Sequence, residues 1–110
     1  MELLTKLEEL VLIAVLRLKH EAYGTTIYKH VTDLTGRRSA MSSIYYPLER
    51  LVRRGLLKAY LGEPTPVRGG MRKRFYRLTR AGVEALQDNR DLTRAAWRGI
   101  GELRPDAGED

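Results

Sequence analysis

The sequence contains no cysteine, only two histidines and no apolar run longer than Leu10–Leu16. Without cysteine there is no disulfide framework and no thiolate zinc site, which suits the cytoplasmic location that we expect. The apolar run is too short to span a bilayer. His20 and His30 lack the neighbouring ligands that a metal site needs. No nucleophile–base pair and no phosphate-binding loop is readable, so we expect no enzyme, no cofactor and no metal.

Negative charge is scarce in the middle of the chain. The whole chain carries a net charge of +6, but residues 36–77 alone carry +9, and the remainder is net acidic. A concentrated positive field suits a polyanion, because phosphates neutralised by Lys and Arg release their counterions. Charge alone leaves open a solvated basic face or a membrane surface. The first ten residues include acidic side chains and no basic stretch before an apolar core, so we expect no signal peptide.

Apolar periodicity and turn residues predict an order of three helices, a hairpin and a long helix. The helices are expected at 3–19, at 25–34 and from about 39–43 to Gly55, which suits a left-handed position after a helix end. Pro47 predicts a late start or a distorted first turn in the third helix. Strands are expected at 56–62 and 71–78, and Thr79 is expected to cap a helix that ends near Ile100.

This order predicts a mainly α fold with a small β-hairpin. It is the architecture of a winged helix-turn-helix domain followed by a long C-terminal dimerisation helix. We expect the winged domain to span 1–78, with its first helix shared with the dimer interface. The dimerisation helix is expected at 79–104, and a disordered tail at 105–110.

The third helix is the predicted reading helix, because the second helix of a helix-turn-helix pair enters the major groove. Arginines on its outer face suit guanine edges or phosphates, and hydroxyls at its amino end suit a phosphate. The alternative is that the serines only cap the helix and the arginines are solvated. The predicted DNA contacts from this region are Ser39, Ser42, Ser43, Tyr46, Arg50 and Arg53, with Tyr45 at the edge.

The second strand and the loop before it carry the remaining predicted DNA contacts, which are Arg68, Arg72, Lys73 and Arg74. A basic wing can lie along the backbone or reach the minor groove, which attracts arginine. The alternative is an edge hairpin whose charges only prevent aggregation. Phe75 and Tyr76 point to opposite faces of the strand, so one of them is expected in the core.

Three segments resemble PadR-type transcriptional regulators of the small form, which has a single C-terminal helix. They are Tyr23-Gly24, the stretch 42–51 with Gly55-Leu-Leu57, and the stretch 69–82, which contains a glycine–basic–aromatic strand and a leucine-threonine step. The resemblance covers about residues 3–82. It implies a dimeric repressor with Tyr45, Lys73 and Arg74 near DNA. Pro47 stands one place later than in the commoner tyrosine-proline arrangement.

The first and last helices carry more apolar surface than one small domain can cover, which predicts a second subunit. The predicted interface residues are Leu3, Leu7, Leu10, Ala14, Leu92, Ala96, Trp97 and Ile100. Some small PadR relatives bind flat apolar ligands between these helices, so Trp97 is either an effector contact or only an interface anchor. The expected partners are a palindromic double-stranded DNA operator, a second copy and a small planar apolar ligand. A protein-interaction module and an RNA-binding winged helix are the alternatives.

Overall fold

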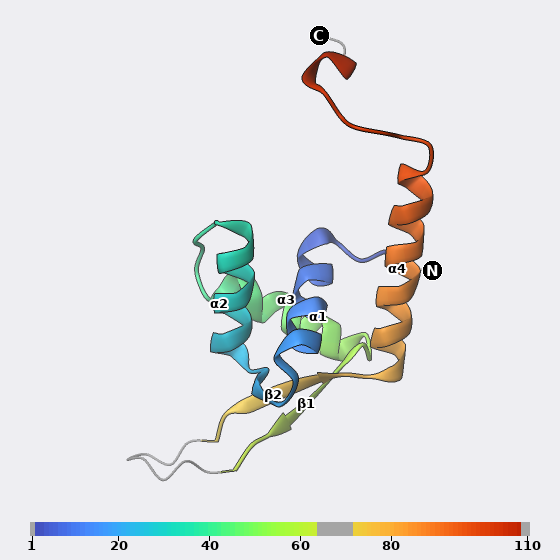
Figure 1. Cartoon of the computed structure of the whole chain (residues 1–110). Coiled ribbons are helices and arrows are strands. Elements are labelled where there is room, and N and C mark those ends of the chain that lie inside the picture. The colour runs from blue at the N-terminus through green and yellow to red at the C-terminus, as the bar shows by residue number, and fades with distance from the viewer. Residues whose placement is uncertain (1, 64–71, 109–110) are drawn as a thin grey trace.

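The computed structural model describes residues 2–63 and 72–108, and it has the predicted order of elements (Figure 1). Strands β1 and β2 form one antiparallel hairpin, and short 3₁₀ turns follow α1 and α4. The elements are α1 (Lys6–Leu18), η1 (Lys19–Glu21), α2 (Gly24–Thr35), α3 (Ser42–Arg53), β1 (Leu57–Leu61), β2 (Arg74–Leu78), α4 (Arg80–Trp97) and η2 (Pro105–Ala107). The fold class predicted from the sequence is therefore confirmed.

Helix α1 is the centre of the core. It contacts α2, α3, β2 and α4, and its residues Val11, Leu12, Ala14 and Val15 are buried. Each surrounding element buries one side against α1, as the spacing of its apolar residues predicts. The buried residues are Ile27 and Val31 from α2, Ile44, Leu48 and Leu51 from α3, and Leu57 and Tyr76 from the hairpin. Burial of this single cluster is the main term that holds the helices and the hairpin together.

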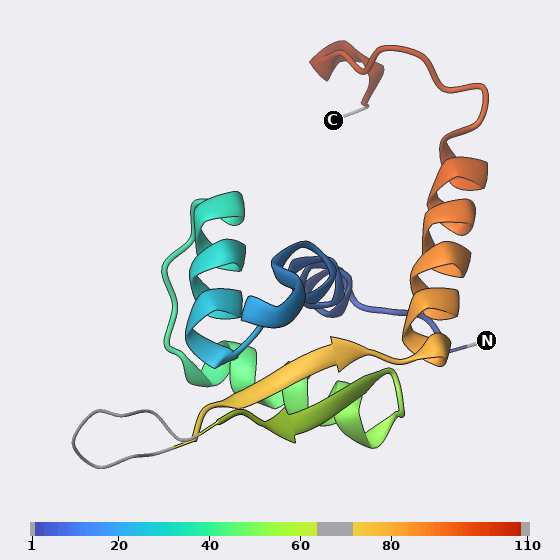
Figure 2. The ribbon, with the colours of Figure 1, turned by 60° about the horizontal axis from the view of Figure 1, so that its bottom comes forward.

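The hairpin packs against α1 through β2 and against α3 through β1 (Figure 2). Its register pairs Ala59 with Tyr76 and Tyr60 with Phe75. The Tyr76 ring is buried and Phe75 is half-buried, which confirms that the two aromatic residues divide between core and outer face. The Tyr76 amide donates to the carbonyl of Ala22 (2.9 Å), so the segment before α2 extends the sheet at β2.

Glycine is required where α4 meets the hairpin. The Thr79 hydroxyl caps α4 by accepting from the Gly82 amide (3.0 Å), and it donates to the Gly55 carbonyl (2.6 Å). A Cβ on Gly82 would lie 2.1 Å from the backbone oxygen of Leu56. The last helix can therefore approach the turn between α3 and β1 only with glycine at this position.

Helix α4 stands at the side of α1 that is opposite α2, and its C-terminal half projects from the domain (Figures 1 and 2). Every residue from 91 to 100 is exposed. Leu92, Trp97 and Ile100 are among the large apolar side chains that face solvent. Within the described residues, no helix is long and apolar enough to cross a membrane.

Three details differ from the sequence-based expectations. Helix α1 begins at Lys6 rather than Leu3, because Thr5 and Glu8 form a reciprocal capping box. Pro47 does not delay the start of α3 and lies buried inside the helix. The turn that leads into α3 is tightened by hydrogen bonds such as the one from the Ile44 amide to the Met41 carbonyl (3.0 Å). Residues Pro105–Ala107 form a 3₁₀ turn within the segment expected to be a disordered tail.

Candidate nucleic-acid interface

The amino end of α3 is fixed by the turn that precedes it. The Tyr28 hydroxyl of α2 donates a hydrogen bond to the carbonyl of Ser39. The Ser39 and Ser43 hydroxyls are 2.7 Å apart and share a hydrogen bond, and Ser43 also donates to the Ala40 carbonyl (2.6 Å). Two of the three predicted serines thus have intramolecular partners that a phosphate would need to replace. Ser42 is exposed.

The outer face of α3 presents Tyr46 and Arg53 to solvent, as its spacing predicts. Tyr46 is the most exposed aromatic side chain among the described residues, at 70%. Arg53 is also exposed, and the buried side of the same helix faces α1. A helix anchored by one face and polar on the other is suited to enter the major groove.

Tyr45, Lys73 and Arg74 line one crevice between α2, α3 and the hairpin, with a volume of about 270 Å³. The sequence separates Tyr45 from the other two by more than 25 residues, and the fold brings them together. The Tyr45 ring lies against Gly24, where a Cβ would be 3.0 Å from its hydroxyl oxygen. The fold thus places these three residues on one surface, and their contact with DNA, which the resemblance implies, stays a prediction.

Two contacts hold the base of the wing against the helices. Arg74 pairs with Glu49 of α3 (2.7 Å), and both side chains are partly exposed. The Lys73 ammonium lies 4.3 Å from the centre of the Tyr23 ring, a cation–π geometry. Burial raises the pKa of the Tyr76 phenol beneath Arg74. The wing base is therefore oriented before any DNA contact, and a phosphate reaching Arg74 competes with Glu49.

Arg50 has a role that its position on the reading helix did not reveal. Its Nε lies 3.5 Å from Oε2 of Glu8, and Arg54 Nη1 lies 3.2 Å from the same oxygen. The other Glu8 oxygen accepts from the Thr5 amide (2.8 Å), and the Glu8 side chain is only 4% exposed. Glu8 thus joins the start of α1 to the C-terminal half of α3.

The ionisation of Glu8 is maintained by these partners. Burial by itself raises the pKa of this carboxyl, but the Thr5 hydrogen bonds, the charge of Arg54 and the hydrogen bond from Arg50 outweigh burial and lower the pKa overall. Arg50 remains about half exposed and is available to DNA on its open side.

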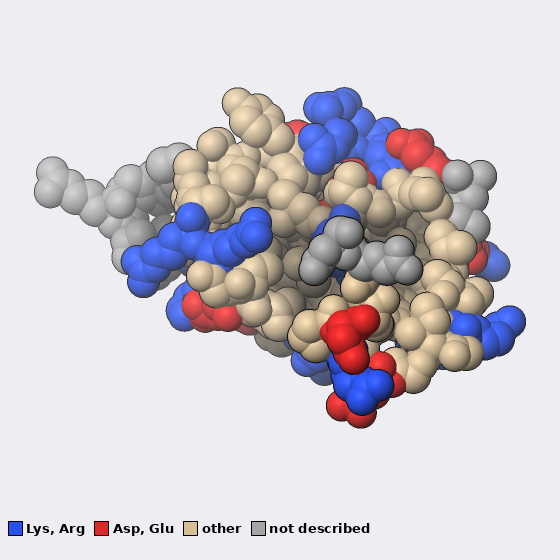
Figure 3. All heavy atoms as spheres, turned by 90° about the horizontal axis from the view of Figure 1, so that it is seen from above, with Lys and Arg blue, Asp and Glu red and all other residues tan. Residues whose placement is uncertain are grey.

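The positive charge does not form one continuous patch over the whole surface of the molecule. In the face shown in Figure 3, blue and red groups are interspersed with uncharged surface. The predicted DNA contacts instead gather on α3 and at the described base of the wing, where Arg72, Lys73 and Arg74 are exposed. Arg68, the remaining predicted wing contact, lies outside the described residues.

The predicted dimer residues divide into three groups by exposure. Ala14 is fully buried inside the chain, so it belongs to the core and is unavailable to a partner, which corrects that assignment. Leu7 and Leu10 are half-buried, and Leu3 is exposed. The α4 residues Leu92, Ala96 and Trp97 and the following Ile100 are all exposed.

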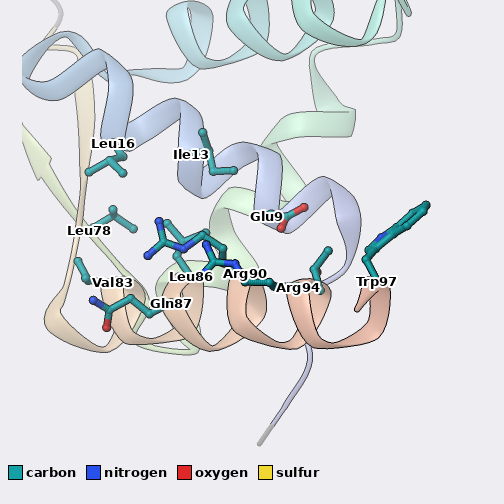
Figure 4. Close-up of a pocket in the computed structure, with 11 residues that line it drawn as sticks. Glu9, Ile13, Leu16, Leu78, Val83, Leu86, Gln87, Arg90, Arg94 and Trp97 are labelled. Carbon is teal, nitrogen blue, oxygen red and sulfur yellow. The ribbon is translucent and has the colours of Figure 1, made fainter. Parts of the chain in front are cut away.

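A groove of about 520 Å³ runs between α1 and α4 (Figure 4). Its apolar walls include Ile13 and Leu16 from α1 and Leu86 from α4, and Trp97 lies at one end. This volume lies within the range of small-molecule sites. Trp97 therefore borders a concave surface, a feature that the sequence alone could not show.

The domain consists of three packed helices and a two-stranded wing, and the third helix, α3, has an exposed basic face. These features define a winged helix-turn-helix protein, which is a DNA-binding class. The profile of the transcriptional regulator PadR-like family matches residues 12–88. The chain belongs to this family. Its function class is therefore transcription regulation through DNA binding. A search of curated proteins finds no match.

Solved structures share the fold over most of their length. A candidate transcriptional regulator from Thermoplasma acidophilum is 21% identical with a TM-score of 0.73, covering 94% of this chain and 93% of that one. A PadR family regulator from Clostridium difficile is 23% identical with a TM-score of 0.63, covering 87% and 91%. A PadR family regulator from Eggerthella lenta is 26% identical with a TM-score of 0.63, covering 84% and 78%.

Removing the basic side chains at the wing base should weaken binding to every duplex sequence. For Arg72→Ala, Lys73→Ala and Arg74→Ala combined, we expect the slope of log affinity against log salt to fall by about 2 to 3, since each phosphate contact contributes about one. Fluorescence anisotropy with random duplexes across a salt series measures this. The charge-matched control is Arg17→Ala, Arg98→Ala and Arg104→Ala. Equal slopes for the two triple variants would show that the wing does not contact phosphate.

Proposed function

We propose that this protein is a homodimeric, sequence-specific repressor that acts on cytoplasmic DNA and has no enzymatic activity. In this proposal α3 reads the major groove of each half-site, and the wing holds the flanking backbone. Two observations carry it: α3 is anchored by one face and exposed on the other, and the outer half of α4 exposes Leu92 and Trp97 without cover from the described residues.

The surface that α4 exposes supports the proposed dimer. Leu92, Trp97 and Ile100 are each about half exposed, and Leu3, which precedes α1, is exposed as well. Large apolar side chains of this kind are typical anchors of subunit interfaces. A two-fold dimer through α1 and α4 would cover them and present two α3 helices to one face of DNA.

Repression released by an effector is the regulatory part of the proposal. The groove between α1 and α4 lies against the same helices that the dimer uses, so a ligand there would change how the two reading helices are spaced. A small apolar molecule fits the groove walls. Loss of operator affinity on ligand binding is the expected coupling.

Selection of bound duplexes from a random pool tests the proposal, with the mass of the recovered complex measured afterwards. We expect a palindromic sequence with half-sites about one DNA turn apart, carried by two copies of the chain. Recovery of no enriched duplex would contradict specific recognition and favour a protein-interaction module. A single copy on an asymmetric site would contradict the homodimer alone.

A further inference from the structure

The reading helix α3 carries a single carboxylate, and this carboxylate lies on the outer face of the helix. Glu49 follows Tyr46 by three positions and precedes Arg53 by four, so the three side chains leave the same side of α3. Glu49 and Glu63 are the only acidic residues in the basic stretch 36–77. A negative charge at this place opposes binding to phosphates. Its position on the outer face therefore favours recognition of something other than the DNA backbone.

The wing supplies the counter-charge of Glu49. Oε1 of Glu49 lies 2.7 Å from Nη1 of Arg74, and the two side chains are 40% and 45% exposed. The Arg74 guanidinium also lies 5.5 Å from the centre of the Tyr76 ring, so it keeps one contact without Glu49. Water screens an ion pair that is this exposed, which makes the pair weak. Arg74 can therefore leave Glu49 at little cost when a phosphate is offered.

Transfer of Arg74 to a phosphate would leave the Glu49 carboxylate without a counter-charge beside DNA. A carboxylate accepts hydrogen bonds and donates none, so it then needs a donor from the duplex. The major groove offers two amino donors, N4 of cytosine and N6 of adenine, and adenine has the N7 acceptor beside its donor. That acceptor repels a carboxylate, so cytosine is the base that suits Glu49. On a sequence without cytosine at the required place, the carboxylate stays unpaired.

We propose that Glu49 selects cytosine at one position of each half-site, and that this contact forms when Arg74 passes from Glu49 to a backbone phosphate. The exchange keeps both charges paired on the preferred sequence and leaves the Glu49 charge unpaired on other sequences. Arg74 thus contributes affinity, and Glu49 contributes specificity. This inference rests on the proposed sequence-specific recognition by α3 and names one base of its operator.

Selection of duplexes from a random pool with the full chain tests the base preference. We expect the wild type to enrich cytosine at one position of each half-site. Glu49→Gln should enrich adenine there, because a glutamine amide pairs with N6 and N7 of adenine. Glu49→Ala should lose the preference at that position and keep the others. Glu84→Ala, which removes an exposed carboxylate paired with Arg80 on α4 (3.3 Å), is the matched control and should enrich the wild-type sequence.

Fluorescence anisotropy measures the size of the contact. Replacing the selected C·G pair by T·A should weaken binding of the wild type about ten-fold or more, and binding of Glu49→Ala less than about two-fold. Glu49→Ala should also bind random duplexes about two- to five-fold more tightly than the wild type, since Arg74 no longer has to leave a carboxylate. Most of this gain should disappear when Arg74→Ala is added.

The outcomes separate this inference from the proposed function. If Glu49→Ala and Glu49→Gln enrich the same bases as the wild type at every position, Glu49 reads no base and the inference is wrong, while specific recognition by α3 stands. If the wild type enriches no duplex, the proposed function is overturned and the inference with it. An undiminished gain on random duplexes in the Arg74→Ala background would contradict the exchange of partners. Alanine is a strong helix former and Glu49 is partly exposed, so both variants are expected to fold.

Discussion

Gly82→Ala is expected to lower the free energy of unfolding by about 3 kcal/mol, the upper range for an overpacked site. The added methyl would lie 2.1 Å from the backbone oxygen of Leu56 and 3.0 Å from the Leu78 side chain. A side chain can rotate away, but the Leu56 carbonyl cannot, because it accepts from the Thr79 amide (3.1 Å). Helix α4 would have to move away from the hairpin, taking the proposed dimer surface with it.

Urea unfolding followed by circular dichroism measures this effect. Gly101→Ala is the matched control, since a Cβ there meets nothing within 4 Å and its backbone has no left-handed angle. We expect that control to change stability by less than about 0.5 kcal/mol. Similar midpoints for the two variants would contradict the close approach of α4 to Leu56.

Glu8→Gln is expected to lower the free energy of unfolding by about 1 to 2 kcal/mol at neutral pH. Glutamine keeps the shape of the side chain but removes the charge that faces Arg54 and Arg50. This loss of stability is smaller than the loss expected when a fully buried ion pair is broken, because the Arg50 guanidinium is about half exposed. Glu84→Gln, at an exposed pair with Arg80, is the control and should have little effect.

The effect of Glu8→Gln should depend on pH with a defined sign. The pKa of Glu8 is lowered from its ordinary value of 4.5 in the folded protein, so the stabilisation is fully present above that value. It is lost as the pH falls below 4.5 and through the lower folded pKa. The difference in stability between wild type and Glu8→Gln should therefore shrink at acidic pH. A difference that is constant from pH 7 to pH 3 would contradict the ion pairing.

The same variant connects stability to DNA recognition. Glu8 links the start of α1, a predicted dimer element, to the C-terminal half of the reading helix. Without its charge, Arg50 is free and α3 is held less firmly. We expect Glu8→Gln to reduce discrimination between a selected duplex and random DNA, measured by competition anisotropy, even where total affinity is preserved.

Local signals in the sequence predicted the elements well. Gly55 has the left-handed backbone expected after α3, and Thr79 caps α4 as expected. The start of α1 was predicted three residues too early, at Leu3, although Thr5 and Glu8 have the spacing of a capping box. Periodicity placed Tyr46 and Arg53 on the outer face of α3, since one helix alone determines its own faces.

Contacts between distant parts of the chain were not readable from spacing. Arg50 and Glu8 are 42 positions apart, so the arginine looked like a free DNA contact. Alternation divided Phe75 and Tyr76 between two faces, but only the packing of the hairpin on α1 shows that Tyr76 is inside. Ala14 was assigned to the dimer interface because it lies on the apolar stripe of α1. The spacing of that stripe does not show which face of α1 the other helices of the same chain cover.

In the proposed function, two reading helices, held by one dimer, bind two half-sites on the same face of DNA. The most direct test of this arrangement is the affinity of the protein for a selected palindromic duplex before and after five base pairs are inserted between the half-sites. The insertion rotates one half-site by about half a turn. We expect affinity to fall to the level of random DNA, whereas unchanged affinity would show that each chain binds DNA alone.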